Sequence, residues 1–252
     1  AEACRNLWEN VTQRRMYVTG GIGSQAYSEC FTIDYDLPND TSYTETCASI
    51  GLIFLAQRNL NLEVDSKYAD VLERALYNGA LAGMSLDGKS FFYVNPLEVW
   101  PEACKMRHDK RHVKTTRQGW FSCACCPPNL ARLLASLGGY VYSSRENEAY
   151  VHLYMGGTAE LSIQGKKVEL EQRTNYPWEG KVELTVSPEE AQEFTLALRI
   201  PGWCDEPALS INGEKIDLSS IIEKGYAKLT RQWSQGDVVE LDFPLEIKRI
   251  YA

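Results

Sequence analysis

The chain has 252 residues, of which 44% are hydrophobic, so it can bury a real apolar core in one large or two medium domains. Its net charge of −8 disfavours nucleic acids and anionic membranes as partners, because an acidic surface repels both. The most apolar window, 48–56, is much shorter than the ~20 residues that a membrane span requires. We therefore expect a globular protein with no nucleic-acid or membrane partner.

Mostly helical periodicity marks the first part of the chain. The expected elements are the helices Glu2–Met16, Thr44–Leu60 and Ser66–Met84, a short strand at Ser90–Val94, and a helix after Cys123–Pro128. The helix Thr44–Leu60 is apolar nearly all round, which indicates burial among other helices. We interpret the basic run Lys105–Arg117 as a solvated loop rather than a binding patch.

Short alternating segments separated by turn residues follow from about Ser143. The expected strands are Ala149–Tyr154, Leu161–Ile163, Lys167–Glu171, Lys181–Val186, Phe194–Ile200, Ala208–Ile211, Tyr226–Leu229 and Val238–Phe243. Asn212-Gly213 predicts a tight two-residue hairpin. Regular short strands favour an antiparallel sandwich. The predicted fold is α+β, with a helical domain over 1–143 and a β-sandwich over 144–252.

Eight cysteines are present, and three of them crowd into the string Cys123–Pro128. Such crowding favours metal binding or catalysis in a reducing, cytoplasmic compartment over a disulfide framework. Pro127 and Pro128 suit the first turn of a helix, so Cys125 and Cys126 should lie at a helix N-terminus, where thiolates are stabilised. Adjacent thiolates repel unless a cation lies between them, and Zn²⁺ prefers such ligands in tetrahedral array.

A second pair of ligands is offered by Glu45 and Cys47. Residues two apart diverge on a regular helix, so both could reach one ion only at the frayed start of the helix. We therefore predict a zinc site of Glu45, Cys47, Cys125 and Cys126. The histidines are poorer candidates, because His108 and His112 lie in the basic run and His152 falls on an expected strand.

Spacing alone favours a structural role for this zinc, since a closed site with four protein ligands usually holds a fold together. Carboxylates and aromatic rings near the site in sequence favour sugar cleavage instead, because that chemistry needs proton transfer and ring contact. These residues are Glu29, Asp34, Asp36, Asp40, Trp100 and Trp120.

Six motifs in the first half of the chain resemble the beta-L-arabinofuranosidases of glycoside hydrolase family 127, and two more continue the match into the strands. They are Val18–Ser24, Tyr35–Asp40, Thr44–Ala48, Glu73–Asn78, Phe92–Leu97 and Cys123–Pro128, then Asn175–Trp178 and Leu198–Trp203. The resemblance implies a retaining exo-glycosidase with an (α/α)6 barrel and β-sandwich domains. Its substrate would be an arabinofuranoside-containing oligosaccharide or glycoconjugate.

The resemblance also implies roles for individual residues. Cys125 matches a zinc-bound thiolate nucleophile, Glu45, Cys47 and Cys126 match its fellow zinc ligands, and Glu29 matches the acid/base. Glu73 and Tyr93 resemble residues that contact the sugar hydroxyls. In such a mechanism the glutamate protonates the departing oxygen and then deprotonates the water that hydrolyses the glycosyl–enzyme.

Two departures from the family pattern stand out. Cys30 follows Glu29 where the family usually carries a small residue, and we interpret it as tolerated packing. The chain also supplies about a third of the family's barrel helices, so we expect a fragment, incomplete in barrel and sandwich, that a homodimer or complementing chain could complete. Two other hypotheses remain: a non-catalytic, zinc-stabilised carbohydrate-binding or scaffolding fragment, and a thiol redox protein using Cys123, Cys125 and Cys126.

Overall fold

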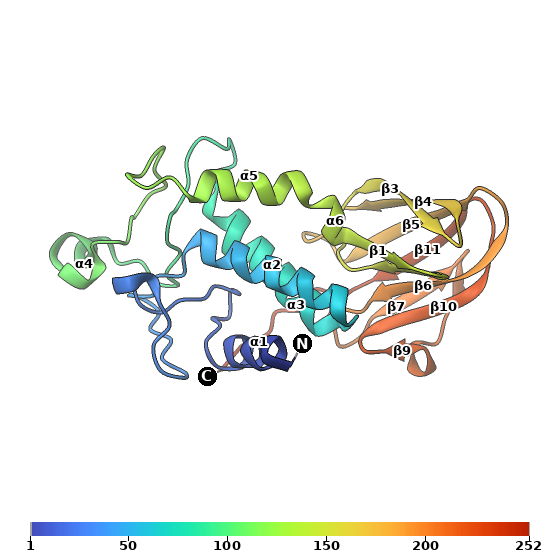
Figure 1. The fold of residues 1–252 in the computed structure, drawn as a ribbon, viewed down its shortest axis with the longest axis horizontal. Coiled ribbons are helices and arrows are strands. Elements are labelled where there is room, and N and C mark those ends of the chain that lie inside the picture. Colours follow the sequence, from blue (N-terminus) through green and yellow to red (C-terminus); the bar gives the residue numbers. More distant parts are fainter. Residues whose placement is uncertain (1, 252) are drawn as a thin grey trace. The chain divides into compact units, whose positions relative to one another are not determined.

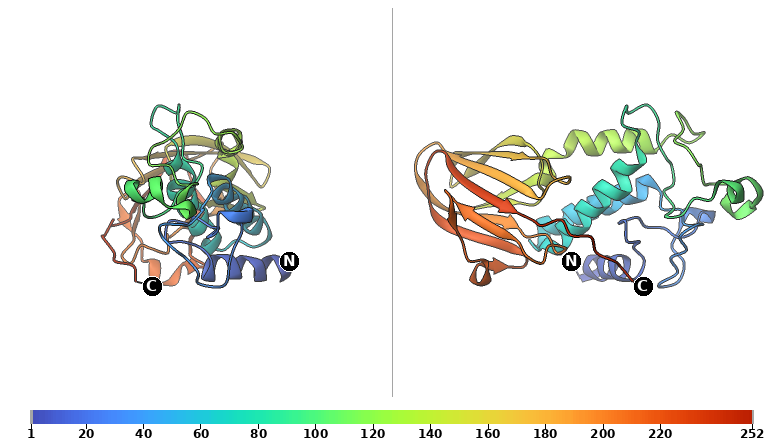
Figure 2. Two further views of the ribbon diagram at one scale, coloured as in Figure 1. Left: turned by 90° about the vertical axis from the view of Figure 1, so that its left-hand side faces the viewer. Right: turned by 180° about the vertical axis from the view of Figure 1, so that it is seen from behind.

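The computed structural model describes residues 2–251, which form two compact units. One holds residues 2–63 and 71–135, and the other holds 64–70 and 136–251. The α-helices, labelled in Figure 1 and drawn from two further sides in Figure 2, are α1 Glu2–Arg14, α2 Thr46–Leu62, α3 Ser66–Arg74, α4 Pro101–Met106, α5 Cys126–Ser136 and α6 Gly138–Val141. The 3₁₀ and π segments are η1 Tyr27–Glu29, η2 Ala75–Ala80, η3 Leu81–Gly83, η4 His108–Lys110 and η5 Leu218–Ser220. With two mostly antiparallel sheets, the fold is α+β.

Helix α2 is the buried helix of the first unit. Its core side chains include Ile50, Ile53 and Ala56, all 0% exposed. The helix begins two residues later than predicted, because Thr44 has a φ of +38° and Glu45 is extended. This late start matters for the candidate site, since it frees the backbone at Glu45 from helical geometry.

The predicted single helix Ser66–Met84 is wrong in its second half. Helix α3 ends at Arg74, and the chain continues as the π-helix η2 and the 3₁₀ turn η3. Helix α2 packs against η2, and a Cβ at Gly79 would lie 2.5 Å from the Ser49 hydroxyl oxygen. The apolar pattern runs on through this change of hydrogen bonding, so periodicity could not reveal it.

A glycine-rich loop packs directly onto the backbone of η2. Gly20 has a φ of +82°, and a Cβ there would lie 2.8 Å from the Ala75 nitrogen. We expect Gly20→Ala to lower the free energy of unfolding by about 2 to 5 kcal/mol, because it adds a backbone clash to the left-handed strain. Gly23→Ala is the control: its φ is +91°, but no atom lies within 4 Å of the new Cβ, so about 1 to 2 kcal/mol is expected. Equal losses in urea denaturation would contradict the proposed clash.

The prediction that the basic run Lys105–Arg117 is a solvated loop is wrong for part of the run. It includes η4, and the Lys110 side chain is 1% exposed, with its ammonium 2.6 Å from Asp40. Arg107 also pairs with Asp40, at 3.5 Å. Burying an ammonium is unfavourable unless a carboxylate compensates it, and Asp40 does so from a distant part of the sequence. These two ion pairs hold the basic segment against the loop that carries Asp40.

Two sheets dominate the second unit, in the strand orders β1-β2-β6-β10-β9 and β3-β4-β5-β11-β7-β8. The strands are β1 Tyr142–Arg145, β2 Glu148–Val151, β3 Gly157–Ile163, β4 Lys166–Thr174, β5 Lys181–Pro188, β6 Gln192–Arg199, β7 Ala208–Ile211, β8 Glu214–Lys215, β9 Ile222–Glu223, β10 Tyr226–Trp233 and β11 Asp237–Asp242. The eight strands predicted after Ser143 are confirmed, with both ends correct for β7 and shifted ends for the others. The strand predicted at Ser90–Val94 is wrong, because that segment makes only isolated bridges, through Phe91 and Val94. The wholly antiparallel expectation is corrected, because β2 and β6 pair in parallel.

The Asn212-Gly213 hairpin is confirmed between β7 and β8. Both residues have positive φ, +51° and +82°, as a type I′ turn requires. Ser210 then pairs with Lys215 and Ile211 with Glu214.

A buried polar network lies in the core of the second unit. The Arg199 side chain is 0% exposed, donates from Nε to the His152 carbonyl at 2.6 Å, and pairs with Asp70 at 2.7 Å. The His152 ring lies 2.8 Å from the Ser143 hydroxyl and 2.7 Å from the Tyr226 hydroxyl. Burial lowers the pKa of His152 to about 3, so its ring is neutral there. His152 lies just after β2, rather than on a strand as predicted.

None of the helices among residues 2–251 has both the length and the hydropathy of a membrane-crossing segment.

Candidate metal and active site

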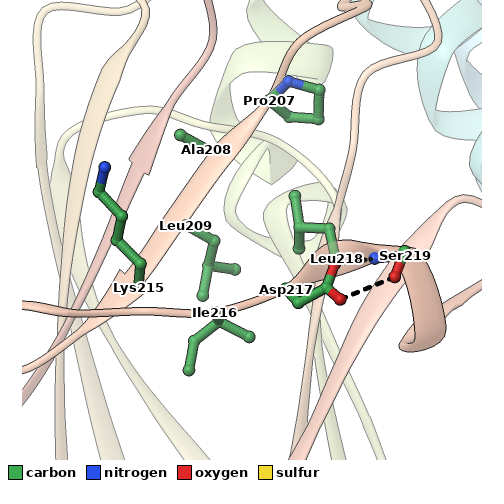
Figure 3. Close-up of a pocket in the computed structure, with 8 residues that line it drawn as sticks. All are labelled: Pro207, Ala208, Leu209, Lys215, Ile216, Asp217, Leu218 and Ser219. Atoms are coloured by element: carbon green, nitrogen blue, oxygen red, sulfur yellow. Dashed lines mark hydrogen bonds between the residues drawn. The ribbon is translucent and has the colours of Figure 1, made fainter.

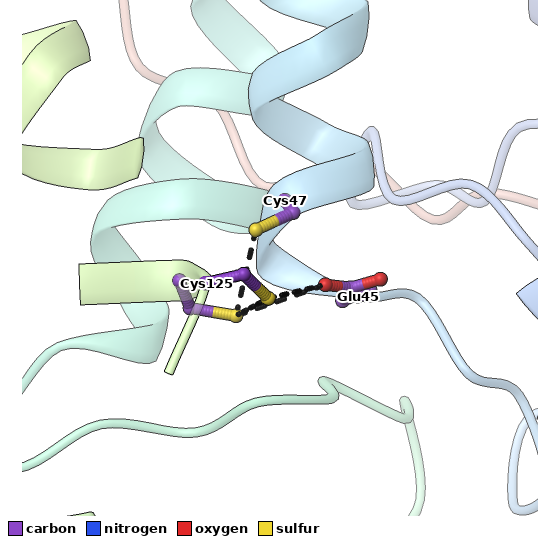
Figure 4. A group of neighbouring side chains, drawn as sticks. Glu45, Cys47 and Cys125 are labelled. Carbon is purple, nitrogen blue, oxygen red and sulfur yellow. Dashed lines mark hydrogen bonds between the residues drawn. The ribbon is translucent and has the colours of Figure 1, made fainter. Parts of the chain in front are cut away.

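Four side chains from distant parts of the chain converge in the first unit, as the sequence predicted. The ligand atoms of Glu45, Cys47, Cys125 and Cys126 all lie within 4.8 Å of one another. Glu45 Oε1 is 3.3 Å from the Cys125 sulfur, and the sulfurs of Cys47 and Cys126 are 3.7 Å apart. Figure 4 shows Glu45, Cys47 and Cys125 pointing toward a common centre.

The start of α5 positions two of the sulfurs. Cys125 directly precedes the helix and Cys126 is its first residue, with Pro127 and Pro128 in the first turn. The Asn129 amide donates to the Cys125 carbonyl at 3.2 Å, which closes that turn. The prediction that these cysteines stand at a helix N-terminus is confirmed.

The start of α2 positions the other two groups. Glu45 occupies the N-cap position with an extended ψ of 141°, and its carboxylate makes no capping bond to the helix. Cys47 lies inside the first turn, so the two side chains can face one point despite being two residues apart. The Thr46 amide donates to the Tyr93 carbonyl at 3.0 Å and the Thr44 hydroxyl to the Asn95 carbonyl at 2.6 Å. This clamp fixes the Glu45 backbone.

The distances within the cluster suit a tetrahedral cation. With Zn–S bonds of about 2.3 Å, two sulfurs on a tetrahedral ion stand roughly 3.8 Å apart. The sulfur–sulfur distances are 3.7 Å for Cys47–Cys126 and 3.9 Å for Cys125–Cys126. Three thiols and one carboxylate are also donors that Zn²⁺ accepts. The cluster therefore fits a metal ion in both geometry and donor chemistry.

Burial makes the thiols of Cys47 and Cys126 poor acids on their own. It raises the pKa of Cys47 to about 12, and it also raises the pKa of Cys126, to which the neighbouring Cys47 and Cys125 contribute. A cation at the centre of the cluster would oppose this effect, because it stabilises thiolates directly.

Tyr93 lies beside the sulfur of Cys125. Its hydroxyl is 3.0 Å from the Cys125 sulfur, and its ring packs 5.5 Å from the ring of Phe121. Burial, with the contact to Cys125 and the charge of Glu45, raises the pKa of the Tyr93 hydroxyl, so it stays a neutral donor. Tyr93 thus adjoins the cluster without belonging to it.

Glu29 stands on a different element, the short turn η1. Both Ser28 and Glu29 have positive φ, +61° and +49°, and Glu29 is exposed. The Tyr43 hydroxyl donates to Glu29 Oε1 at 2.7 Å. The ring of Tyr43 lies 6.2 Å from that of Tyr93, so tyrosine rings connect the Glu29 turn to the Cys125 side of the site.

Known proteins share this architecture. Residues 1–139 match the family model "Beta-L-arabinofuranosidase, GH127 catalytic domain", and residues 148–245 match the GH127 middle domain. The chain belongs to glycoside hydrolase family 127. This observation confirms the resemblance read from the sequence motifs.

Individual relatives are longer than this chain. It is 44% identical to a non-reducing end beta-L-arabinofuranosidase of Bifidobacterium longum, covering 98% of this chain and 37% of that protein. The crystal structure of a GH127 beta-L-arabinofuranosidase from Geobacillus stearothermophilus is 63% identical, with a TM-score of 0.96, covering 100% of this chain and 39% of that one. Another GH127 beta-arabinofuranosidase structure is 40% identical, with a TM-score of 0.86, covering 96% and 39%.

Glu73 and the histidines lie outside the cluster of this family 127 chain. Glu73 stands near the end of α3 with its side chain 5% exposed, so its carboxylate is buried rather than solvated. In the described part of the chain no histidine joins the cluster, as expected. His112 instead packs against the Tyr43 ring at 5.8 Å.

Sequence reasoning missed Tyr43. It directly precedes the Thr44–Ala48 motif, two residues before Glu45, which was the available signal. Asn129 was also missed, and its hydrogen bond to the Cys47 thiol partly offsets the effect of burial on the pKa of that thiol.

A hollow of about 340 Å³ in the second unit is a weaker candidate (Figure 3). Its carboxylate, Asp217, already accepts hydrogen bonds from the amide and hydroxyl of Ser219, each at 2.9 Å. The remaining lining is mostly apolar. We place no chemistry there.

Proposed function

We propose that this chain carries the catalytic centre of a retaining glycoside hydrolase that releases L-arabinose from beta-L-arabinofuranosides. The observation that carries the proposal is the convergence of three sulfurs and one carboxylate within 4.8 Å, in a chain of family 127. The chain spans 37% of its curated relative, so we assign the activity to the full gene product. We further propose that 1–143 is part of an (α/α)6 barrel and 144–252 a β-sandwich.

In this proposal Cys125 attacks the anomeric carbon and Glu29 protonates the departing oxygen. Glu29 then removes a proton from the water that hydrolyses the glycosyl–cysteine bond. Glu73 and Tyr93 contact the sugar hydroxyls. Tyr93 also supports the nucleophile, because its hydroxyl lies 3.0 Å from the Cys125 sulfur and can donate to a thiolate.

Zn²⁺ is the proposed metal, held by Glu45, Cys47, Cys125 and Cys126. When bound, it supplies the positive charge that keeps clustered thiols deprotonated at neutral pH. The eight free cysteines support a reducing, cytoplasmic location as part of the same proposal.

Activity and metal content can be tested together on the purified full gene product. We expect hydrolysis of 4-nitrophenyl beta-L-arabinofuranoside and one zinc ion per chain by elemental analysis. Removal of the metal with a chelator should abolish turnover and lower the melting temperature by about 5 °C or more, because structural zinc contributes folding free energy. Restored activity on adding Zn²⁺ back is the control.

No turnover by the zinc-loaded gene product across a panel of pentosides would end the proposal. Sugar binding without hydrolysis, unchanged by Cys125→Ser, would instead support a non-catalytic, zinc-stabilised carbohydrate-binding or scaffolding role.

A further inference from the structure

Glu29, the proposed acid/base, lies on a segment that does little to fix its carboxylate. The residue is exposed and belongs to a three-residue turn in which Ser28 and Glu29 both have positive φ. The turn is closed by the Gln25 and Cys30 backbones, which exchange two hydrogen bonds of 3.2 Å. These bonds fix the backbone and leave the side-chain torsions to be set by contacts of the carboxylate itself.

Tyr43 makes such a contact, and its own backbone and ring are held in place. The next residue, Thr44, receives a bond from Asn95 Nδ2 at 3.2 Å and donates its own amide to the Gly23 carbonyl at 2.9 Å. The Tyr43 ring is held between Tyr93, at 6.2 Å, and His112, at 5.8 Å. The backbone next to Tyr43 is therefore fixed by hydrogen bonds of the same segment that carries Glu45, and the Tyr43 ring is held by Tyr93 and His112.

We propose that Tyr43 is a positioning residue for Glu29, an inference that rests on the proposed function. Its hydroxyl donates to Glu29 Oε1 at 2.7 Å. A carboxyl group carries its proton on the oxygen that is not accepting a strong hydrogen bond, so the bond at Oε1 assigns the transferred proton to Oε2. Because Tyr43 stands two residues before Glu45, its bond to Glu29 fixes the position of the acid/base carboxylate relative to the proposed metal ligands.

If Tyr43 positions Glu29, the effect of losing its hydroxyl should depend on the leaving group of the substrate. A general acid is needed most when the leaving group is a poor one, such as an alcohol or another sugar, and least when it is a stabilised phenolate. A misplaced Glu29 should therefore lower kcat/KM for methyl beta-L-arabinofuranoside much more than for the 4-nitrophenyl glycoside. General damage to the fold or to the metal site would lower both alike.

Tyr43→Phe removes the hydroxyl and keeps the ring packing. In the zinc-loaded full gene product we expect it to lower kcat/KM for the methyl glycoside by about 10- to 100-fold and for the 4-nitrophenyl glycoside by less than about 3-fold, with metal content unchanged. Tyr27→Phe is the matched control. It removes a hydroxyl from the turn that carries Glu29, where the Tyr27 side chain is 81% exposed, and should leave kcat/KM for both substrates unchanged.

Glu29→Gln separates the two levels of the proposal. It should show the same dependence on leaving group with a larger loss. If Glu29→Gln shows it and Tyr43→Phe behaves as wild type, or loses both substrates equally, the positioning role is overturned and the proposed function stands. If Glu29→Gln itself shows no dependence on leaving group, the assignment of the acid/base fails, and Tyr43 loses its role with it.

Discussion

Cys125→Ser is expected to reduce turnover of a beta-L-arabinofuranoside by about 10³-fold or more, while the protein stays folded. The substitution changes one atom at the centre of the cluster, 3.3 Å from Glu45 Oε1 and 3.0 Å from the Tyr93 hydroxyl. Serine is a far weaker nucleophile than a thiolate, because its hydroxyl stays protonated near neutral pH. The measurement is kcat on the 4-nitrophenyl glycoside, with zinc content and circular dichroism recorded for the same preparation.

Cys123→Ser is the matched control for this experiment. Cys123 lies two residues earlier in the same string, is exposed and lies outside the cluster. Its side chain contacts the Tyr93 hydroxyl, a contact that serine can keep, so its variant should lose less than about 3-fold in turnover. Substantial activity in Cys125→Ser, with metal bound, would contradict the assignment of the nucleophile. Loss of activity in both variants would point to the string as a structural element instead.

Arg199→Met is expected to lower the free energy of unfolding by about 3 to 5 kcal/mol. Methionine fills much of the space but removes the guanidinium that pairs with Asp70 and leaves the His152 carbonyl without the Nε donor at 2.6 Å. Because the guanidinium is 0% exposed, water cannot replace these bonds without opening the core. Urea denaturation followed by fluorescence measures the loss.

Arg173→Met supplies the comparison on strand β4. Arg173 is 66% exposed and pairs with Glu171 at 2.9 Å, so the same substitution should change stability by less than about 0.5 kcal/mol. Similar losses for Arg199 and Arg173 would show that the buried network adds no stability beyond that of a surface ion pair.

The Cys125–Cys126 half of the candidate site was predictable because its signals are local. Two cysteines followed by two prolines indicate both a metal ligand pair and a helix start, and the structure has Cys126 as the first residue of α5. Alternation likewise predicted the strands, including Ala208–Ile211 with both ends correct. Each of these features depends on residues that are neighbours along the chain.

The features that escaped prediction depend on distant partners. Burial of Lys110 requires Asp40, seventy residues earlier, and the Tyr43 bond requires Glu29 on a turn with left-handed backbone. The parallel pairing of β2 with β6 depends on which strands meet, which alternation does not encode. The (α/α)6 barrel stays a prediction, and so do the roles of Glu73 and the other site residues.

The positions of Glu45 and Cys125, each just before a helix, have a consequence for the unfolded chain. Glu45 and Cys125 stand 80 residues apart, yet their ligand atoms are 3.3 Å apart. An ion held between them would act as a cross-link that closes this long loop and restricts the denatured ensemble. In the chain-entropy treatment of disulfides, a loop of that length corresponds to about 4.5 kcal/mol. The same four side chains proposed for chemistry would then also link the start of α2 to the start of α5.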